Sequence, residues 1–289
     1  MKIIPGPASK ELGEGIAKHS NLGIVPLSLR VFPDGESYIR LEGNVENEKV
    51  AIVQTTSPPQ DTRLVQLALI ADAAKRNGAT KVTAVIPYLA YARQDKVFLQ
   101  GESLSIDAIA RMLKAAGIDS LLTVNMHQER ILTKFPFPAK TVSAIPLLAE
   151  YFKQKDLGRT FIVSPDQGAI HIAEEAKKVL GAECGYLEKK RDRHTGQVRM
   201  ENRILDVRDK TTIIFDDIIS SGGTIVEAAR ILEGLGAKKI LVACVHPLLI
   251  GDAEKRIFQS GVEEIVGTDS VPSHVSKISL APLLSKALT

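Results

Sequence analysis

The sequence predicts an α/β protein with two similar doubly wound domains, each built on a mainly parallel sheet. Short runs of β-branched residues recur along the chain, and segments with helical periodicity follow them. Runs such as Ile213 to Phe215 and Ile240 to Val245 are apolar throughout, as strands are when helices cover both faces of a parallel sheet. At 289 residues the chain exceeds the usual size of one domain, so we expect two.

The predicted elements alternate between strand and helix. The pairs cover residues 50 to 54 and 62 to 76, 81 to 87 and 103 to 116, 160 to 164 and 169 to 180, 211 to 215 and 223 to 235, and 239 to 246 and 251 to 259, with a further strand at 120 to 125. Prolines gather between Phe135 and Pro146 and mark the best interior connection between domains. We therefore expect an N-terminal domain at 1–142 and a C-terminal domain at 143–289, with the boundary uncertain by several residues.

Composition points to small partners. With 37 basic and 34 acidic residues the net charge is only +3, so neither nucleic acid nor a membrane surface is an expected partner. The two cysteines, Cys184 and Cys244, lack the spacing of a zinc site or a disulfide framework, which favours a reducing cytoplasm. No apolar run approaches the roughly 18 residues of a membrane-spanning helix, and no signal-type segment opens the chain. We expect a soluble, cytoplasmic protein.

Ligand-binding residues in open α/β sheets lie just beyond the carboxyl ends of the strands. After the apolar strand that ends at Phe215, the chain continues with two acids and a turn of hydroxyl and glycine residues that opens a helix. Such a turn favours a phosphate, because glycines let the backbone approach an anion, which the free N–H groups and helix dipole attract. The candidate phosphate-binding residues are Ser220, Ser221, Gly222, Gly223 and Thr224.

The two acids, Asp216 and Asp217, suggest that a sugar accompanies the phosphate. A vicinal diol donates two hydrogen bonds, which ionised carboxylates accept. The alternative is a capped helix after an ordinary turn, in which Asp and Ser serve turn chemistry alone. The position of both acids directly after a buried strand favours the ligand site.

This segment resembles the phosphoribosyl diphosphate loop shared by type I phosphoribosyltransferases and ribose-phosphate diphosphokinases. The resemblance implies domains of the type I phosphoribosyltransferase kind. It also implies that Ser220 to Thr224 bind the phosphate of ribose 5-phosphate and that Asp216 and Asp217 lie near its hydroxyls. The loop alone does not separate a transferase from a kinase.

The segment Pro87 to Lys96 separates them, because PYLAYARQDK matches the PYxxYxRQD signature of the diphosphokinases, which the transferases lack. In physical terms Arg93 offers a fixed fork of donors for a polyphosphate, and Gln94 can both donate to and accept from an adenine edge. Taken alone, the segment would be an exposed polar loop with an ordinary Arg–Asp pair. The resemblance implies that Arg93 and Gln94 bind ATP.

A third segment, Phe32 to Glu36, resembles the turn that diphosphokinases contribute to the ATP site of a neighbouring subunit. The resemblance implies that Asp34, Gly35 and Glu36 bind ATP, and that the protein is a homo-oligomer whose active site a second subunit completes. By itself, Asp-Gly-Glu is a common turn.

Two further strand ends match the family. His127 corresponds to a histidine that contacts metal-bound ATP, although a lone histidine after a strand is more often a hydrogen-bonded loop residue. Nearby Asn125 replaces the family's usual acid, which removes a hard anionic ligand for magnesium. Asp166 matches the acid of the family's S-P-D-x-G motif. The resemblance implies that His127 and Asp166 lie at the metal, or that Asp166 contacts the ribose hydroxyls.

The last candidate is the basic stretch Glu188 to His194. From charge alone it would be a solvated hairpin. It aligns with the flexible catalytic loop of the diphosphokinases, which implies that Lys189 and Arg191 are the catalytic cations; Glu188 and Lys190 replace the family's common His and Glu. A polar segment with little apolar anchorage suits a loop that opens and closes.

Taken together, the motifs follow family order over nearly the whole chain. They imply an enzyme that transfers the diphosphoryl group of Mg-ATP to the C1 hydroxyl of ribose 5-phosphate, with Mg²⁺ as cofactor, in nucleotide biosynthesis. A phosphoribosyltransferase is an alternative that would leave Arg93 and Lys189 idle. A non-catalytic regulatory subunit of the same family is another, but its catalytic loop or phosphate turn should be damaged, and here both are intact.

Two other nucleotide-binding classes are disfavoured. The chain has no G-x-x-x-x-G-K-[ST] motif, and Gly13-Glu14-Gly15 lacks the third glycine of a dinucleotide fingerprint.

Overall fold

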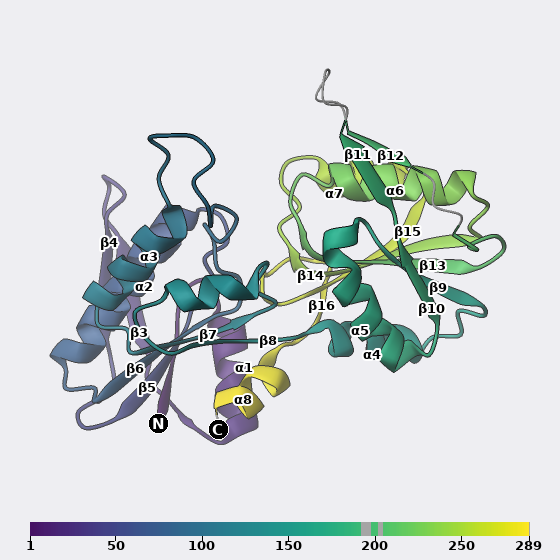
Figure 1. Ribbon diagram of the computed structural model, residues 1–289. Helices are drawn as coiled ribbons and strands as arrows, with labels where there is room; N and C mark the ends of the chain where they lie inside the picture. Colours follow the sequence, from purple (N-terminus) through teal and green to yellow (C-terminus); the bar gives the residue numbers. More distant parts are fainter. Residues whose placement is uncertain (192–197, 202–204, 289) are drawn as a thin grey trace. The chain divides into compact units, whose positions relative to one another are not determined.

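A computed structural model describes residues 1–191, 198–201 and 205–288 (Figure 1). The chain forms two compact units. Unit 1 comprises Met1–Ser143, Ser270–Pro272 and the segment from Ser279 onward, and unit 2 comprises Ala144–Asp269 and Ser273–Ile278. No helix among these described residues has the length and apolar content needed to cross a membrane.

Unit 1 is built on a parallel sheet with the strand order β2-β1-β5-β6-β7-β8. Its strands are β1 (Lys2–Pro5), β2 (Gly23–Ile24), β5 (Lys49–Val53), β6 (Lys81–Ile86), β7 (Ser120–Val124) and β8 (Ala139–Val142). Its helices are α1 (Lys10–Ser20), α2 (Gln60–Arg76), α3 (Ser105–Ala115), the short 3₁₀ helix η1 (Glu129–Lys134) and α8 (Ala281–Leu288). A separate antiparallel hairpin joins β3 (Leu27–Val31) to β4 (Ser37–Leu41).

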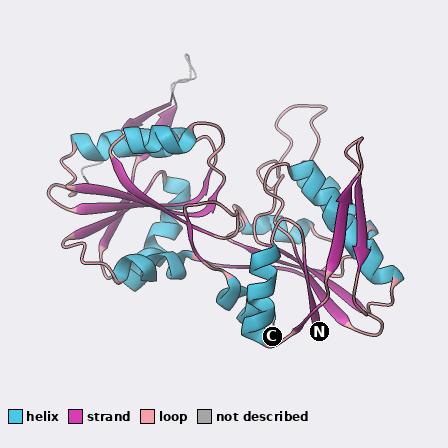
Figure 2. Cartoon of the chain, turned by 180° about the vertical axis from the view of Figure 1, so that it is seen from behind, coloured by secondary structure: helices cyan, strands magenta, loops and turns pink. Residues whose placement is uncertain are grey.

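Helices cover both faces of this sheet, as the continuous apolar strands require (Figures 1 and 2). Ile4 and Ile52 are fully buried in one cluster with side chains of α2 and α3. Because side chains alternate along a strand, the equally buried Ile3 and Val53 face the opposite side, where α1 lies against β1 and β5. Each such side chain contributes about 1.5–3 kcal/mol through burial.

The glycines of α1 serve close packing. A Cβ on Gly13 would lie 2.8 Å from Pro5 Cβ at the end of β1, and a Cβ on Gly15 would lie 3.0 Å from Ala281 Cβ at the start of α8. Glycine at positions 13 and 15 therefore allows α1 to pack closely against β1 and α8.

The sequence predicts residues 143–289 as one C-terminal domain, and the last segment differs from that expectation. After β16 the chain returns to unit 1, where α8 packs on α1 and buries Leu280 and Leu284 completely. The reason is hydrophobic: these side chains complete the covering of the sheet face that α1 alone leaves open.

Unit 2 repeats the architecture, with the strand order β10-β9-β13-β14-β15-β16. Its strands are β9 (Thr160–Ser164), β10 (Glu183–Tyr186), β13 (Thr211–Ile219), β14 (Lys239–Pro247), β15 (Val262–Thr268) and β16 (Ser276–Ile278). Its helices are α4 (Ile145–Lys153), the short 3₁₀ helix η2 (Gln167–Ala169), α5 (Ile170–Leu180), α6 (Gly223–Gly234) and α7 (Ala253–Gln259). A two-stranded antiparallel ribbon pairs β11 (Glu188–Arg191) with β12 (Val198–Glu201).

The two sheets match strand for strand, with the first strand second from one edge in each. This confirms the predicted pair of similar, doubly wound domains. In unit 2, α6 and α7 pack against Ile214, Val242 and Ile265 on one face of the sheet. On the other face, the Phe152 ring of α4 meets the Phe215 ring of β13 edge-on, with 6.2 Å between centroids.

A partly buried cluster of ionic hydrogen bonds connects the C-terminal end of α4 to β15 and β16. Glu264 of β15 accepts hydrogen bonds from Lys155 Nζ at 2.6 Å, Lys277 Nζ at 2.8 Å and the Tyr151 hydroxyl at 2.9 Å. Burial alone would raise the pKa of Glu264, but these donors outweigh it and lower the pKa from its usual 4.5 to about 2. The ionised carboxylate therefore stabilises the folded unit.

We expect Glu264→Gln to lower the free energy of unfolding at pH 7 by about 2 kcal/mol, after allowing for its partial exposure. A depressed pKa contributes stability above the unfolded value near 4.5, and that contribution is lost as the pH falls toward about 2. Urea denaturation from pH 7 to pH 2.5 checks this. Glu263→Gln is the control, because Glu263 makes only an exposed 3.8 Å pair with Lys239; equal effects of the two substitutions would contradict the assignment.

Candidate functional site

The predicted phosphate turn lies between β13 and α6 in unit 2. Gly222 is the N-cap of α6 and adopts φ 75°, a left-handed conformation that suits glycine. The backbone N–H groups of Ser221, Gly222, Gly223 and Thr224 donate no hydrogen bond within the described part of the chain. They form an open set of donors at a helix N-terminus, which is the arrangement that binds phosphate groups.

The predicted acids Asp216 and Asp217 lie inside β13, which extends to Ile219. The apolar pattern predicts that this strand ends at Phe215, and that boundary is wrong. β14 is equally long, and it continues to pair with β13 from Asp216 opposite Cys244 to Ile219 opposite Pro247. The acids therefore lie within a strand, and the Asp216 Oδ1 atom accepts a hydrogen bond from the Asp217 N–H at 2.9 Å.

Asp166 approaches these acids from the end of the adjacent strand β9. Its Oδ1 atom accepts a hydrogen bond from the Ala169 N–H at 3.2 Å and caps the 3₁₀ helix η2. Burial, followed by the charges of Asp217 and Asp166, raises the pKa of Asp216 well above its usual value. The structure thus brings three predicted site residues together, and their mutual repulsion favours a cation or hydroxyl donors beside them.

In unit 1, the segment after β6 holds the predicted Arg93 and Gln94. Arg93 is exposed and has no ion-pair or hydrogen-bond partner among the described residues, so its guanidinium is available to a ligand. The Gln94 Oε1 atom accepts a hydrogen bond from the Ser105 hydroxyl at 2.5 Å. This contact uses one of the two lone pairs of Oε1, and the Nε2 group of Gln94 is a donor that suits a ligand.

Two long-range contacts that the sequence analysis missed hold this segment. Asp95 accepts hydrogen bonds from Arg130 of η1 at 2.9 and 2.8 Å. Tyr91, at an unusual φ of 66°, donates its hydroxyl to Asp61 of α2. Bulky residues at positive φ cost of order 1–3 kcal/mol and persist where surrounding contacts enforce them, often at functional sites. No local motif signals either pair.

His127 lies just before η1, and the Asp95–Arg130 contact therefore links the predicted His127 and Arg93 segments within unit 1. His127 is exposed. Asn125 has φ 38°, in the left-handed region that asparagine tolerates better than most residues. Its backbone N–H donates to Val142 O at 2.9 Å, which attaches this turn to the end of β8.

The predicted Asp34, Gly35 and Glu36 form the tip of the β3–β4 hairpin and are all exposed. The Asp34 side chain accepts a hydrogen bond from the Glu36 N–H at 3.2 Å, and Gly35 has φ 95°. Phe32 N and Glu36 O close the turn at 2.8 Å. The tip is thus a preformed turn that presents two carboxylates to solvent.

The predicted catalytic cations, Lys189 and Arg191, lie in β11 opposite Met200 and Val198 of β12. The antiparallel pairing of β11 with β12 is compatible with either interpretation of this segment, and the catalytic role of the two cations stays a prediction. His194 and the rest of the predicted basic stretch beyond Arg191 lie outside the described residues.

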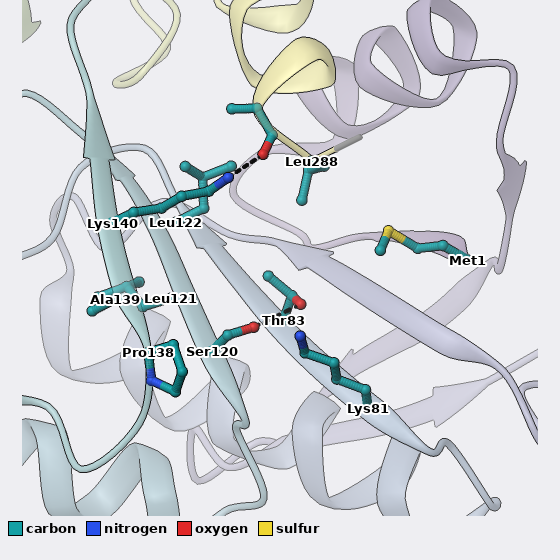
Figure 3. A pocket seen from close by; sticks show the side chains of 11 residues that line it. Met1, Lys81, Thr83, Ser120, Leu121, Leu122, Pro138, Ala139, Lys140 and Leu288 are labelled. Carbon is teal, nitrogen blue, oxygen red and sulfur yellow. Dashed lines mark hydrogen bonds between the residues drawn. The ribbon is translucent and has the colours of Figure 1, made fainter.

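A pocket of about 260 Å³ lies elsewhere in unit 1, at the amino ends of β6, β7 and β8 (Figure 3). The Lys140 ammonium donates a hydrogen bond to the Ala287 carbonyl at this pocket. Figure 3 shows Lys140 together with the hydroxyls of Thr83 and Ser120, which share a hydrogen bond. None of the predicted site residues lines this pocket. It lies at the strand ends opposite to those where α/β sheets bind their ligands.

Comparisons with known proteins cover both units. A family model for the N-terminal domain of ribose phosphate pyrophosphokinase matches residues 1–117, and a model for a phosphoribosyl transferase domain matches residues 141–275. The ribose-phosphate pyrophosphokinase of Methanothermobacter thermautotrophicus is 43% identical over 288 residues, 99% of either chain. That of Saccharolobus solfataricus is 40% identical over 272 residues, 94% of this chain and 93% of the relative.

A solved structure is similar as well. The crystal structure of phosphoribosylpyrophosphate synthetase from Mycobacterium smegmatis superposes with a TM-score of 0.89 at 30% sequence identity. It covers 99% of this chain and 97% of that one, so the likeness includes both units.

We expect Gly222→Ala to lower the free energy of unfolding by about 1–2 kcal/mol, the cost of a left-handed conformation for a residue with a Cβ. The added Cβ would also lie 3.0 Å from Ile257 Cδ1. Gly223→Ala is the matched control, since its Cβ would meet nothing within 4 Å. Urea midpoints of both variants test this, and a similar loss in both would show that the conformation of Gly222 is not the cause.

Proposed function

The chain belongs to the ribose-phosphate pyrophosphokinase family, and we propose that Lys189 and Arg191 provide the catalytic charge for its reaction. As a ribose-phosphate diphosphokinase, it transfers the diphosphoryl group of ATP to the C1 hydroxyl of ribose 5-phosphate, giving 5-phosphoribosyl 1-diphosphate and AMP. The hydroxyl attacks the β-phosphorus in line, and charge spreads over the non-bridging oxygens. Positioning and cations supply most of the catalysis of such a transfer.

Ribose 5-phosphate binds at the turn from Ser220 to Thr224. The main support is the set of unpartnered amides at the N-terminus of α6, joined by the hydroxyls of Ser220, Ser221 and Thr224. Asp216 and Asp217, at the end of β13, accept hydrogen bonds from the ribose hydroxyls. Phosphate and sugar are thereby held by adjacent parts of one strand–turn–helix segment.

ATP binds to residues that follow the strands of unit 1. The guanidinium of Arg93, which has no partner among the described residues, suits the polyphosphate, and the Nε2 donor of Gln94 suits an acceptor on the adenine edge. His127 contacts the nucleotide close to its phosphates. The Asp95–Arg130 contact supports these two segments together.

Magnesium fits the donors available in unit 2. Mg²⁺ prefers oxygen ligands and is commonly held by one or two carboxylates together with substrate phosphates. No cluster of three or more metal-ligating side chains occurs in the ranges that the structure describes, so a cage built from protein alone is not the arrangement we propose. Asp166 is the carboxylate of unit 2 that would hold the ion, and His127 is the residue of unit 1 that we propose for the metal-bound nucleotide. When bound, Mg²⁺ neutralises phosphate charge.

The hairpin tip with Asp34, Gly35 and Glu36 completes the ATP site of a second copy of the chain. Its two carboxylates contact no cation of their own subunit among the described residues, and the tip is exposed throughout. The protein is therefore a homo-oligomer in which each subunit supplies part of its neighbour's site.

We also propose the cytoplasm as the compartment. Cys184 and Cys244 are free thiols, which suits a reducing environment.

Lys189→Ala should lower turnover by roughly 10² to 10⁴, the range known for removal of a preorganised cation or oxyanion donor. Binding of ribose 5-phosphate, measured by calorimetry, should remain. Phosphorus NMR of a mixture with Mg-ATP and ribose 5-phosphate reports AMP and the new diphosphate ester together. Lys178→Ala removes an exposed lysine of α5 and should keep full turnover; unchanged turnover in Lys189→Ala would exclude that lysine from the mechanism.

A shared active site makes two inactive variants complement each other. Asp34→Ala damages the hairpin tip and Lys189→Ala damages the catalytic strand, so each variant alone should lose most activity. Co-expressed in equal amounts, they should recover activity in about a quarter of the sites, because random assembly unites an intact tip with an intact strand at that frequency. No recovery beyond the sum of the single variants would show that each site belongs to one subunit.

A further inference from the structure

Three consecutive carbonyl groups, from Ile219 at the end of β13 to Ser221 in the phosphate turn, accept hydrogen bonds from one segment, Leu249 to Arg256, which includes the first turn of α7. The Leu249 N–H donates to Ile219 O at 3.0 Å, and the Ile250 N–H donates to Ser220 O at 3.0 Å. The third bond comes from a side chain, because Arg256 Nη2 donates to Ser221 O at 2.5 Å.

Side chains of α7 also pack against the turn. At the position where Gly222 lacks a Cβ, Ile257 Cδ1 and Ala253 Cβ lie 3.0 and 3.4 Å away. Leu249 has φ 45°, a strained conformation for a leucine, at the bend that aims its amide at the turn. The contact between α7 and the turn is therefore close, and local strain is tolerated to make it.

The Arg256 contact fixes the direction of one amide. The Ser221 carbonyl and the Gly222 N–H belong to the same planar peptide group and point in opposite directions in a trans peptide. Holding this carbonyl toward α7 directs the Gly222 N–H away from α7, to the open side of the turn. A hydrogen bond to the carbonyl also polarises the peptide and strengthens its N–H as a donor.

Stability is a poor explanation for Arg256. Its Nε atom donates to Asp252 Oδ1 at 2.9 Å, with side-chain exposures of 43% and 68%, and pairs as exposed as this contribute little to folding. The pair instead holds the guanidinium in line with the turn. Arg40 and Arg76 have comparable acidic partners, but neither contacts a ligand-binding loop.

We propose that Arg256 is a positioning residue that orients the Ser221–Gly222 peptide for the sugar phosphate and adds positive charge behind it. This inference rests on the proposed binding of ribose 5-phosphate at the turn. According to this inference, α7 contributes to the affinity for ribose 5-phosphate through Arg256, which does not itself contact the substrate.

The test is steady-state kinetics of Arg256→Gln with both substrates varied. Loss of a charge-assisted hydrogen bond should raise the KM for ribose 5-phosphate roughly tenfold or more. The KM for ATP and the kcat at saturating ribose 5-phosphate should stay within about twofold, since only the phosphate turn is affected. Arg256→Lys keeps the charge and should recover part of the affinity.

Arg76→Gln is the matched control, because Arg76 forms the same i,i+4 pair with Asp72 in α2 at 2.7 Å and has no contact with the turn. It should leave all kinetic constants unchanged. If Arg256→Gln lowers kcat and melting temperature without changing the KM for ribose 5-phosphate, the residue is merely structural and the inference fails. Should Arg256→Gln not fold, Asp252→Asn, which loosens the same guanidinium, must raise that KM in the same direction, and an unchanged KM overturns the inference.

Thr224→Val separates this inference from the function on which it rests. If Thr224→Val raises the KM for ribose 5-phosphate and Arg256→Gln does not, the turn binds the substrate without help from Arg256, and the inference alone is wrong. If neither substitution changes that KM, the phosphate lies elsewhere, and both the inference and the proposed binding site are overturned.

Discussion

Parallel pairing of β13 between β9 and β14 is the constraint on which the site of unit 2 depends. All three strands run in one direction, so their carboxyl ends deliver Asp166, the two acids of β13 and the Leu249 to Arg256 segment to the same edge. This edge of the sheet therefore combines negatively charged carboxylates with positively polarised backbone N–H groups. Burial, and then the charges of Asp217 and Asp166, raise the pKa of Asp216. A few residues along the chain, backbone amides without a partner among the described residues attract anions. A ligand with hydroxyls at one end and a phosphate at the other satisfies both.

Many of the strands, helices and turns of unit 2 could be predicted from the sequence, because they depend on local residue patterns. Residues 160 to 164 are predicted and observed as a strand, and α6 begins at the predicted Gly223. Both follow from an apolar run bounded by turn residues. The phosphate turn was recognisable for the same reason, because its glycine and hydroxyl residues are contiguous. The end of β13 was not, since its length is set by β14, a strand more than twenty residues later in the chain.

What the sequence could not predict are contacts between distant residues. Arg130 meets Asp95 across 35 positions, and Arg256 meets Ser221 across the same separation. In each case the arginine stands in an ordinary helical context, and only the fold gives it a partner beside a ligand-binding segment. The hairpin of β3 and β4 was missed for a different reason. Its residues pack only partly against the rest of unit 1, so their apolar pattern is weak, and the tip was recognised only through its resemblance to the family's turn.

The return of α8 to unit 1 bears on how the protein emerges from the ribosome. Residues 1 to 143 are synthesised first, yet one face of their sheet keeps an uncovered patch against α1 until Leu280 and Leu284 have been added. Unit 2 is translated in between and has no such dependence on later residues. The apolar surface of residues 1 to 143 is therefore exposed while unit 2 is synthesised and folds. Chaperone binding during translation is accordingly most useful to unit 1, whose main part is made first.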